Sequence, residues 1–161
     1  MVRRRVRGDL FEYPTDRGSA FLQYCFDTPF YGEMVRVIEG LFTGETPSLE
    51  SLVERPTLFW APVPLGSALY RKEVRYLANR PFPTREQIPP WMKGRGAFNH
   101  DGLVLSWSIF TFDEQGKYAQ DYWVTNRTLT RWEMRLSRLH GQSHDLFRED
   151  VEAQARPEEE P

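Results

Sequence analysis

Three apolar runs in the first quarter of the chain predict three β-strands joined by tight turns. The runs cover residues 8–13, 20–26 and 34–39. The two segments that separate them, residues 15–18 and 27–32, contain the turn formers Asp and Gly, and the second also contains Pro. Strands that follow one another at such short distances usually pair as antiparallel neighbours. The pattern therefore predicts the opening meander of a small, strongly bent β-sheet or barrel.

The middle of the chain predicts a helix, a strand and then a long loop. Residues 48–54 have the pattern of a short helix, with Thr46 or Ser48 as the N-cap. Residues 58–63 have the pattern of a strand, but the prolines in and after this run limit it to a sheet edge or a bulge. Residues 79–96 are so rich in Pro and Gly that we expect an ordered loop without regular structure.

Short strands are also predicted at residues 68–70 and 74–77, before that loop. The clearest alternation comes after it, over residues 103–110. A turn at residues 113–116 then leads into residues 117–124, which we expect to return as the partner strand of a hairpin.

The last part of the chain changes to helical spacing. Thr128 or Thr130 can cap a helix in which Trp132, Leu136 and Leu139 lie on one face. A second helical segment is predicted over residues 143–155. The C-terminal region from residue 128 onward is therefore expected to be helical.

These elements predict a mainly β or α+β fold, as a strongly bent antiparallel sheet or an SH3-like half-open barrel. A short early helix and C-terminal helices complete it. We expect residues 1–7 to form a basic arm and residues 156–161 a disordered acidic tail. Residues 8–155 are expected to form one globular domain, which is β-rich over 8–125 and helical over 128–155.

Composition adds a surplus of aromatic side chains to this picture. Aromatic residues make up 14% of the 161 residues, which favours a β-rich core and leaves some rings for a binding surface. The net charge of −2 disfavours a general nucleic-acid-binding protein. A single Cys, no membrane-length apolar run and no signal peptide predict a cytoplasmic protein, and the excess of Arg over Lys is typical of a GC-rich bacterial genome.

No residue pattern predicts catalysis, a metal or a cofactor. His140 and His144 are four residues apart, but Gly141 lies between them and no third ligand falls at a recognised spacing. Cys25 lies in an apolar strand and is expected to be a small buried side chain, while His100 lies in a turn. We therefore expect a non-enzymatic binding protein without a cofactor.

Seven residues are candidate binding contacts because they place aromatic or acidic side chains in turns, in the long loop or on the late hairpin. They are Tyr31, Glu33, Trp91, Asp113, Tyr118, Asp121 and Tyr122. Trp91 has an alternative role as a cover for the core. Tyr118 and Tyr122 are expected to share one strand face, and one face of that strand must be buried. If the acidic residues are contacts, the partner should be basic.

Parts of the chain resemble the immunity protein twenty-six family of bacterial polymorphic toxin systems. The resemblance rests on residues 8–14 and 18–24, and continues at residues 58–63, 74–83 and 89–92. It covers roughly residues 8–110 and implies an SH3-like barrel with additions. It also implies a cytoplasmic protein that binds and neutralises a toxin of the same bacterium. The acidic candidate contacts predict that the bound partner is a basic toxin domain.

Two other functions stay open at this point. The chain can be an SH3-like module that binds nucleic acid or a peptide, with Arg3–Arg7 as a basic arm. It can also be an enzyme of another type, which requires His100 or Cys25 to lie in a cleft beside a second titratable group.

Overall fold

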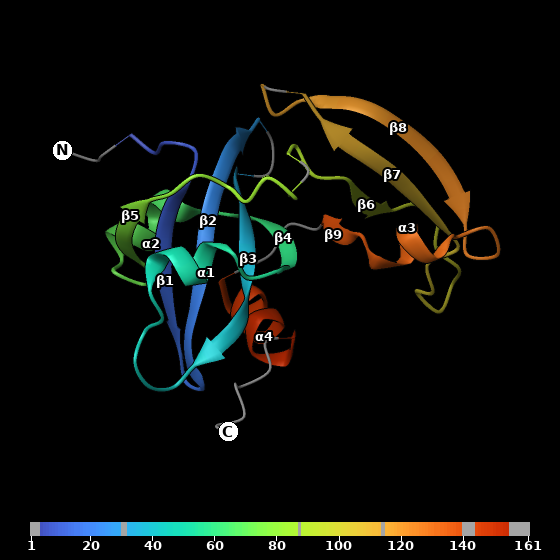
Figure 1. Ribbon diagram of the computed structural model, residues 1–161. Coiled ribbons are helices and arrows are strands. Elements are labelled where there is room, and N and C mark those ends of the chain that lie inside the picture. The colour runs from blue at the N-terminus through green and yellow to red at the C-terminus, as the bar shows by residue number, and fades with distance from the viewer. Residues whose placement is uncertain (1–3, 30–31, 87, 114, 140–143, 155–161) are drawn as a thin grey trace.

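The computed structural model describes residues 4–29, 32–86, 88–113, 115–139 and 144–154, which form two β-sheets and four helices (Figure 1). The first sheet has the strand order β4-β3-β2-β1-β5 and is antiparallel throughout. Its strands are β1 (Asp9–Thr15), β2 (Gly18–Thr28), β3 (Gly32–Phe42), β4 (Thr57–Val63) and β5 (Arg75–Asn79).

The second sheet has the order β8-β7-β6-β9, in which only the pair β6–β9 is parallel. Its strands are β6 (Met92–Arg95), β7 (Ser106–Phe112), β8 (Tyr118–Thr125) and β9 (Ser137–Leu139). The mainly β fold class is thus confirmed, with two sheets that do not close into a barrel within the described residues.

Both faces of the first sheet are buried. One face packs against α2 (Leu65–Tyr70) and α4 (His144–Gln154), which contribute Leu65, Phe147 and Val151 to the largest apolar cluster. The other face packs against α1 (Leu49–Val53) through Leu52 and Val53. This two-sided cover explains why β2 and β3 are continuous apolar runs rather than alternating ones.

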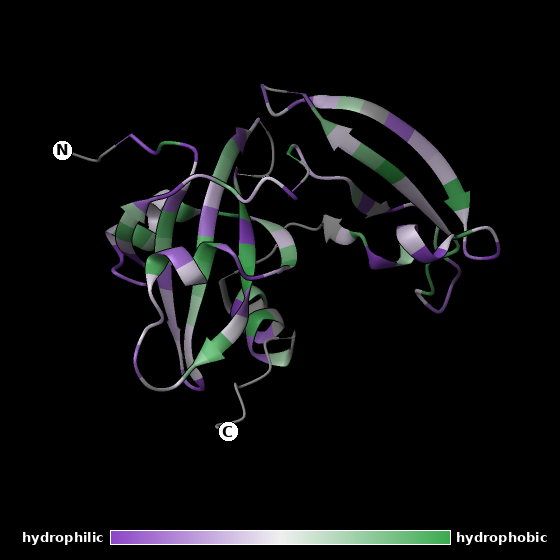
Figure 2. Cartoon of the chain, in the orientation of Figure 1, coloured by the Kyte–Doolittle hydropathy of each residue, from purple (hydrophilic) through white to green (hydrophobic). Residues whose placement is uncertain are grey.

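The second sheet joins the first through a third apolar cluster. Met92 and Phe110 of the second sheet pack there with Cys25, Met34 and Trp60 of the first. Beyond this contact β7 and β8 arch away from the first sheet, with α3 (Arg131–Arg135) beneath them (Figure 1). Most of β8 is hydrophilic, with one hydrophobic band near its start and another at its end (Figure 2).

Several predicted elements are confirmed. Ser48 caps α1 by accepting a hydrogen bond from the Ser51 N–H, at 3.2 Å. β4 is an edge strand with a register shift, as its prolines predicted. The late hairpin forms around residues 113–116, and Cys25 is buried.

Other predictions are wrong for identifiable reasons. Residues 68–70 belong to helix α2 rather than a strand, and the end of the Pro-rich loop forms β6, which pairs with β7 and β9. The helix that begins after Thr130 ends at Arg135, and residues 137–139 form β9 because pairing with β6 overrides their helical spacing.

The Gly8-Asp9 pair at the start of β1 has a structural role. Gly8 has φ of +95°, and a Cβ at this position would collide with the carbonyl oxygen of Arg80. Asp9 accepts hydrogen bonds from the Val6 N–H and the Asn79 side chain, both at 2.9 Å. The pair therefore fixes where the N-terminal segment enters the first sheet.

None of the described helices has the length and apolar character needed to cross a bilayer.

Candidate functional site

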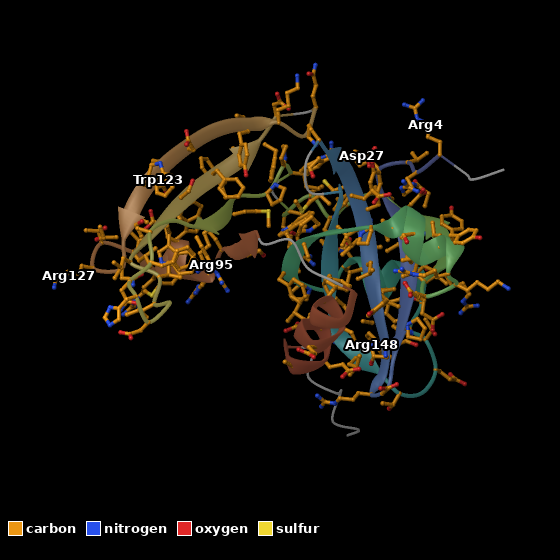
Figure 3. All side chains as sticks on the ribbon, turned by 180° about the vertical axis from the view of Figure 1, so that it is seen from behind. Arg4, Asp27, Arg95, Trp123, Arg127 and Arg148 are labelled. Carbon is orange, nitrogen blue, oxygen red and sulfur yellow. The ribbon has the colours of Figure 1, made fainter. Side chains whose placement is uncertain are left out.

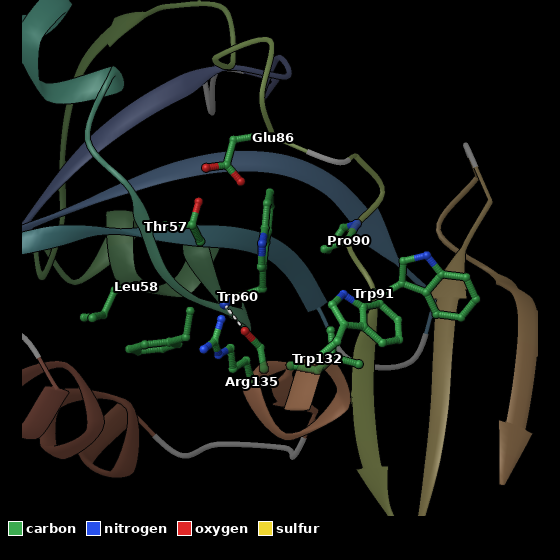
Figure 4. Close-up of a pocket in the computed structure, with 11 residues that line it drawn as sticks. Thr57, Leu58, Trp60, Glu86, Pro90, Trp91, Trp132 and Arg135 are labelled. Carbon is green, nitrogen blue, oxygen red and sulfur yellow. Dashed lines mark hydrogen bonds between the residues drawn. The ribbon is translucent and has the colours of Figure 1, made fainter. Parts of the chain in front are cut away.

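A pocket of about 270 Å³ opens where the edges of the two sheets meet. β4 is the edge of the first sheet, and its Trp60 N–H donates to the Ser137 hydroxyl of β9 at 2.7 Å. We call this cavity the seam pocket. Figure 4 shows Glu86 at one end of it and Arg135 at the other, with Trp60 between them and the indoles of Trp91 and Trp132 to one side.

The floor of the seam pocket is held by a buried ion pair and two stacked rings. Trp60 stacks on Phe82 with ring centroids 6.1 Å apart, and the guanidinium of Arg36 lies 5.7 Å from the same Phe82 ring. Arg36 is fully buried, and it donates to Glu86 Oε1 at 3.2 Å and to the Val53 carbonyl at 2.7 Å. Burial lowers the pKa of Arg36, and the neighbouring Glu86 carboxylate opposes that shift.

An aromatic cluster of Trp91, Tyr122 and Trp132 borders the pocket. The Trp91 ring lies 6.0 Å from Trp132 in an edge-to-face arrangement and 6.3 Å from Tyr122. Trp132 is 49% exposed and Tyr122 39% exposed, although both rings make these contacts. The cluster therefore presents large apolar rings to solvent in fixed positions.

Helix α3 is fastened to the second sheet at both of its ends. Thr130 and Glu133 form a capping box at the N-terminus, and the Lys93 ammonium donates to the carbonyls of Glu133 and Met134 at the C-terminus. The Tyr122 hydroxyl donates to Glu133 Oε1 at 2.8 Å. Trp132 and Arg135 are thereby held on an anchored turn of helix rather than on a free loop.

The pKa values of Tyr122 and Glu133, which are joined by this hydrogen bond, shift in opposite directions. Burial and the Glu133 carboxylate raise the pKa of Tyr122 to about 12. Hydrogen bonds from the Thr130 backbone and the Tyr122 hydroxyl lower the pKa of Glu133. Both shifts favour the state in which the phenol is protonated and the carboxylate is ionised, which is the state that makes the hydrogen bond.

The structure brings together two of the seven predicted contact residues, Trp91 and Tyr122. Tyr118 and Tyr122 were expected to share a strand face, and this expectation is wrong. A bulge opposite Thr111 and Phe112 turns Tyr118 to the other face, where it packs on Phe110 and Phe112.

The acidic candidates lie elsewhere and are separated from one another. Glu33 forms an ion pair with Arg5 and accepts from the Gly66 N–H at 3.1 Å. Asp113 accepts two backbone N–H groups in the hairpin turn. Asp121 is exposed on β8 opposite Phe110, on the face away from Tyr122, and Tyr31 lies outside the described residues.

Sequence reasoning missed Trp60, Trp132 and Arg135 as site residues. Trp60 was assigned only to an edge strand, and Trp132 only to the apolar face of a long helix. The available signal was the alternation of charged and large apolar residues over 131–135, which is unusual for a face that only packs inward.

The residues considered for catalysis are not assembled into a cleft. His100 is exposed in a turn, with its Nε2 atom 3.1 Å from Asp101. Burial raises the pKa of Cys25 to about 12, which keeps the thiol protonated near neutral pH. Within the described part of the chain no three His, Cys, Asp or Glu residues lie in a group that can hold a metal ion; His140 and the side chain of His144 lie outside that part.

Comparison of the chain with protein-family models, curated proteins and solved structures finds no match in any of the three. The resemblance to the immunity protein twenty-six family stays a prediction. The argument for function therefore rests on the seam pocket and the aromatic cluster.

Proposed function

We propose that this protein binds another protein through the seam pocket and the aromatic cluster beside it. The observation that carries the proposal is the set of large rings held at the surface around a cavity at the junction of the two sheets. Trp, Tyr and Arg are enriched among the residues that dominate binding energy at protein interfaces, and they act best in well-packed, desolvated positions. Trp132, Tyr122 and Arg135 have these identities and lie around one pocket.

The seam pocket suits the insertion of a partner side chain. Its Trp60 wall is 7% exposed and is backed by Phe82, so the wall does not need to rearrange to receive a ligand group. A pocket that is already formed reduces the entropic cost of binding.

We propose further that the binding is of the immunity type. In that role the protein would sit in the cytoplasm of a bacterium and mask the active surface of a toxin made by the same cell. The family resemblance of residues 8–110 supports this, and the activity would consist of one-to-one binding without turnover. A rigid, aromatic surface is suited to the high affinity that such neutralisation needs.

The alternative nucleic-acid function depends on the basic arm, and the described arm residues already have contacts within the chain. Arg5 pairs with Glu33, and the Arg7 guanidinium lies 5.9 Å from the Phe82 ring. These contacts compete with phosphate binding. Deletion of residues 1–7 separates the two functions, because only the nucleic-acid function requires that segment.

The test is a pull-down from a lysate of the source organism with three exposed-ring variants as baits. Trp132→Ala removes a ring from the aromatic cluster. Tyr70→Ala removes one that is 87% exposed on α2, and Trp123→Ala removes one that is 63% exposed on the opposite face of the second sheet. We expect the native protein and both controls to retain one stoichiometric protein that Trp132→Ala loses.

The retained protein should be toxic when expressed alone and harmless when co-expressed with the native chain. Equal capture by Trp132→Ala and by the native protein would place the interface elsewhere. Recovery of nucleic acid that salt releases, in place of a protein, would favour the alternative function.

A further inference from the structure

The exposed charge beside the seam pocket is cationic, and from this we infer that the bound partner segment is acidic. The inference rests on the proposed function and deepens it by assigning the chemistry of the partner. The occupant is an extended protein segment with several Asp or Glu residues around one apolar side chain. The carboxylates lie against the arginines on the α3 side of the second sheet, and the apolar side chain enters the seam pocket.

Four exposed arginines belong to β6, to the turn between β8 and α3 and to α3 itself, and we call them the arginine face: Arg95, Arg127, Arg131 and Arg135. Arg95 is two residues along β6 from Lys93, whose ammonium reaches the C-terminal carbonyls of α3, so both side chains project toward that helix. Arg131 and Arg135 are four residues apart on α3 and share one side of it. Figure 3 shows Arg95 and Arg127 on this lobe, far from Arg4 and Arg148.

The arginine face differs from the arginines around the first sheet in its pairing. Arg36, Arg75 and Arg80 of the first-sheet region each form an ion pair with a Glu, as do Arg5, Arg71 and Arg85. Among the described residues, no ion pair involves the four arginines of the arginine face. Exposed arginines that lack a counter-ion among the described residues attract an acidic ligand.

The acidic groups close to this face are already engaged. Glu133 is 5% exposed and accepts from Tyr122 and Thr130. Glu86 pairs with Arg36 behind the pocket, and Asp101 lies beside His100 at the end of the neighbouring loop. Arginines therefore outnumber these described carboxylates on the α3 side of the second sheet, although the whole chain has a net charge of −2.

This assignment reverses the partner charge that the sequence predicted. The expectation of a basic partner rested on Glu33, Asp113 and Asp121. Two of these carboxylates have partners inside the chain, and Asp121 lies on the opposite face of β8 from Tyr122. Arg135 lines the seam pocket itself, and the carboxylate in the same lining, Glu86, is paired with Arg36.

Guanidinium groups pair with carboxylates through two parallel hydrogen bonds, which gives geometric specificity as well as attraction. Arginine beside tryptophan also suits single-stranded nucleic acid, where bases stack on the rings. The net acidity of the chain and the small size of the arginine face favour the protein segment. Nucleic acid is accordingly one of the outcomes that the test separates.

The experiment measures the binding of three labelled probes by fluorescence anisotropy at low and at physiological salt. The first probe is a short synthetic peptide in which Glu alternates with Ser around one central Phe. The second has Lys in place of every Glu, and the third is an oligouridine of similar length. We expect the acidic peptide to bind the native protein, the Lys peptide not to bind, and the oligouridine to bind more weakly than the acidic peptide.

Two charge-matched double variants locate the binding. Arg131→Glu/Arg135→Glu reverses two charges of the arginine face, while Lys72→Glu/Lys117→Glu reverses two exposed cations elsewhere. We expect the first to weaken acidic-peptide binding by about tenfold or more and the second to leave it unchanged. Far-UV circular dichroism and thermal melts establish that both variants are folded.

Four results would overturn the inference: no binding of the acidic peptide, equal binding of the Lys peptide, indifference to Arg131→Glu/Arg135→Glu, or tighter binding of the oligouridine. The pull-down of the preceding section decides the proposed function separately. A protein that Trp132→Ala loses but that Arg131→Glu/Arg135→Glu retains at full yield would uphold the proposed function and refute the acidic segment.

Discussion

The two sheets use their apolar residues in different ways. In the first sheet β2 and β3 contain six and five consecutive buried residues, because helices cover both faces. In the second sheet β8 leaves Tyr118, Tyr122 and Trp123 exposed, and α3 adds Trp132 and Met134. The contrast indicates that the first sheet supplies most of the stability of the fold, while the second presents a surface for binding.

The same contrast holds for charged residues. The first sheet buries Arg36 completely and pairs its guanidinium with Glu86 and the Val53 carbonyl. The second sheet keeps its arginines at the surface and uses Lys93 to hold α3. A substitution of a buried residue should therefore lower the stability of the whole fold when it is made in the first region, and should affect mainly α3 and binding when it is made in the second.

The largest expected effect is that of Arg36→Leu. The substitution leaves the Glu86 carboxylate without its cation and the Val53 carbonyl without its donor. Removing one partner of a buried ion pair typically costs about 3–5 kcal/mol, and we expect a loss of that order in the free energy of unfolding. Urea denaturation measures it as a lower midpoint.

The double variant Arg36→Leu/Glu86→Leu serves as the control for that measurement. Replacing both partners removes the uncompensated charge, so the double variant should be more stable than Arg36→Leu. Two results would contradict the account of a coupled buried pair. One is a loss of less than about 1 kcal/mol in the free energy of unfolding for Arg36→Leu, and the other is a loss in the double variant equal to the sum of the losses in the two single variants.

A smaller effect is expected from the two helix caps, one in each region. Ser48→Ala removes the cap of α1 and Thr130→Ala removes the cap of α3, and each should cost about 1 kcal/mol. Amide hydrogen exchange should show Thr130→Ala speeding exchange in α3 and β9 alone. Ser48→Ala should lower the protection of β2 and β3 as well, because α1 covers the face that they bury.

The two cap variants are distinguished by which strands lose hydrogen-exchange protection, and not by how much stability each variant loses. If Thr130→Ala reduced protection in β2 as much as Ser48→Ala did, the two regions would unfold together. That result would contradict the proposal that the first sheet stabilises the fold while the second sheet serves binding.

The first sheet was predictable because its local signals agree with its tertiary environment. Residues 20–26 form an apolar run that suits a strand buried on both faces, and Ser48 has the identity and position of an N-cap. The edge position of β4 followed from Pro62, which cannot donate to a neighbouring strand. Each of these inferences needed only the chain within a few residues.

The second region was not predictable in the same way, because long-range pairing decides it. β6 is four residues in a Pro- and Gly-rich segment and exists through its pairing with β7 and β9. Trp60 and Trp132 meet at the seam pocket although they are far apart in the chain. The bulge that separates Tyr118 from Tyr122 leaves no signal in residue identity, so the shared face was predicted wrongly.

The smallest expected effect is a loosening of α3 in acid. Glu133 has a lowered pKa in the folded state, against an ordinary value of 4.5. A carboxyl whose folded pKa is depressed stabilises the fold fully above its unfolded pKa, and this contribution is lost as the pH falls through the folded value. Below about pH 4.5 protonated Glu133 therefore holds Tyr122 and the Thr130 backbone less tightly, while the apolar packing of the first sheet does not titrate.

Glu133→Gln isolates this contribution, since the Gln carbonyl oxygen can accept from the Thr130 N–H and its amide N–H can donate to the Tyr122 hydroxyl oxygen, but Gln does not titrate. We expect tryptophan fluorescence of the native protein to change below about pH 4.5, through Trp91 and Trp132, in a step that Glu133→Gln lacks. Far-UV circular dichroism of both proteins should stay constant over that step. A fluorescence step of equal size in Glu133→Gln would assign the acid sensitivity to other carboxylates, and a simultaneous loss of circular dichroism would show that the second sheet does not loosen independently of the first.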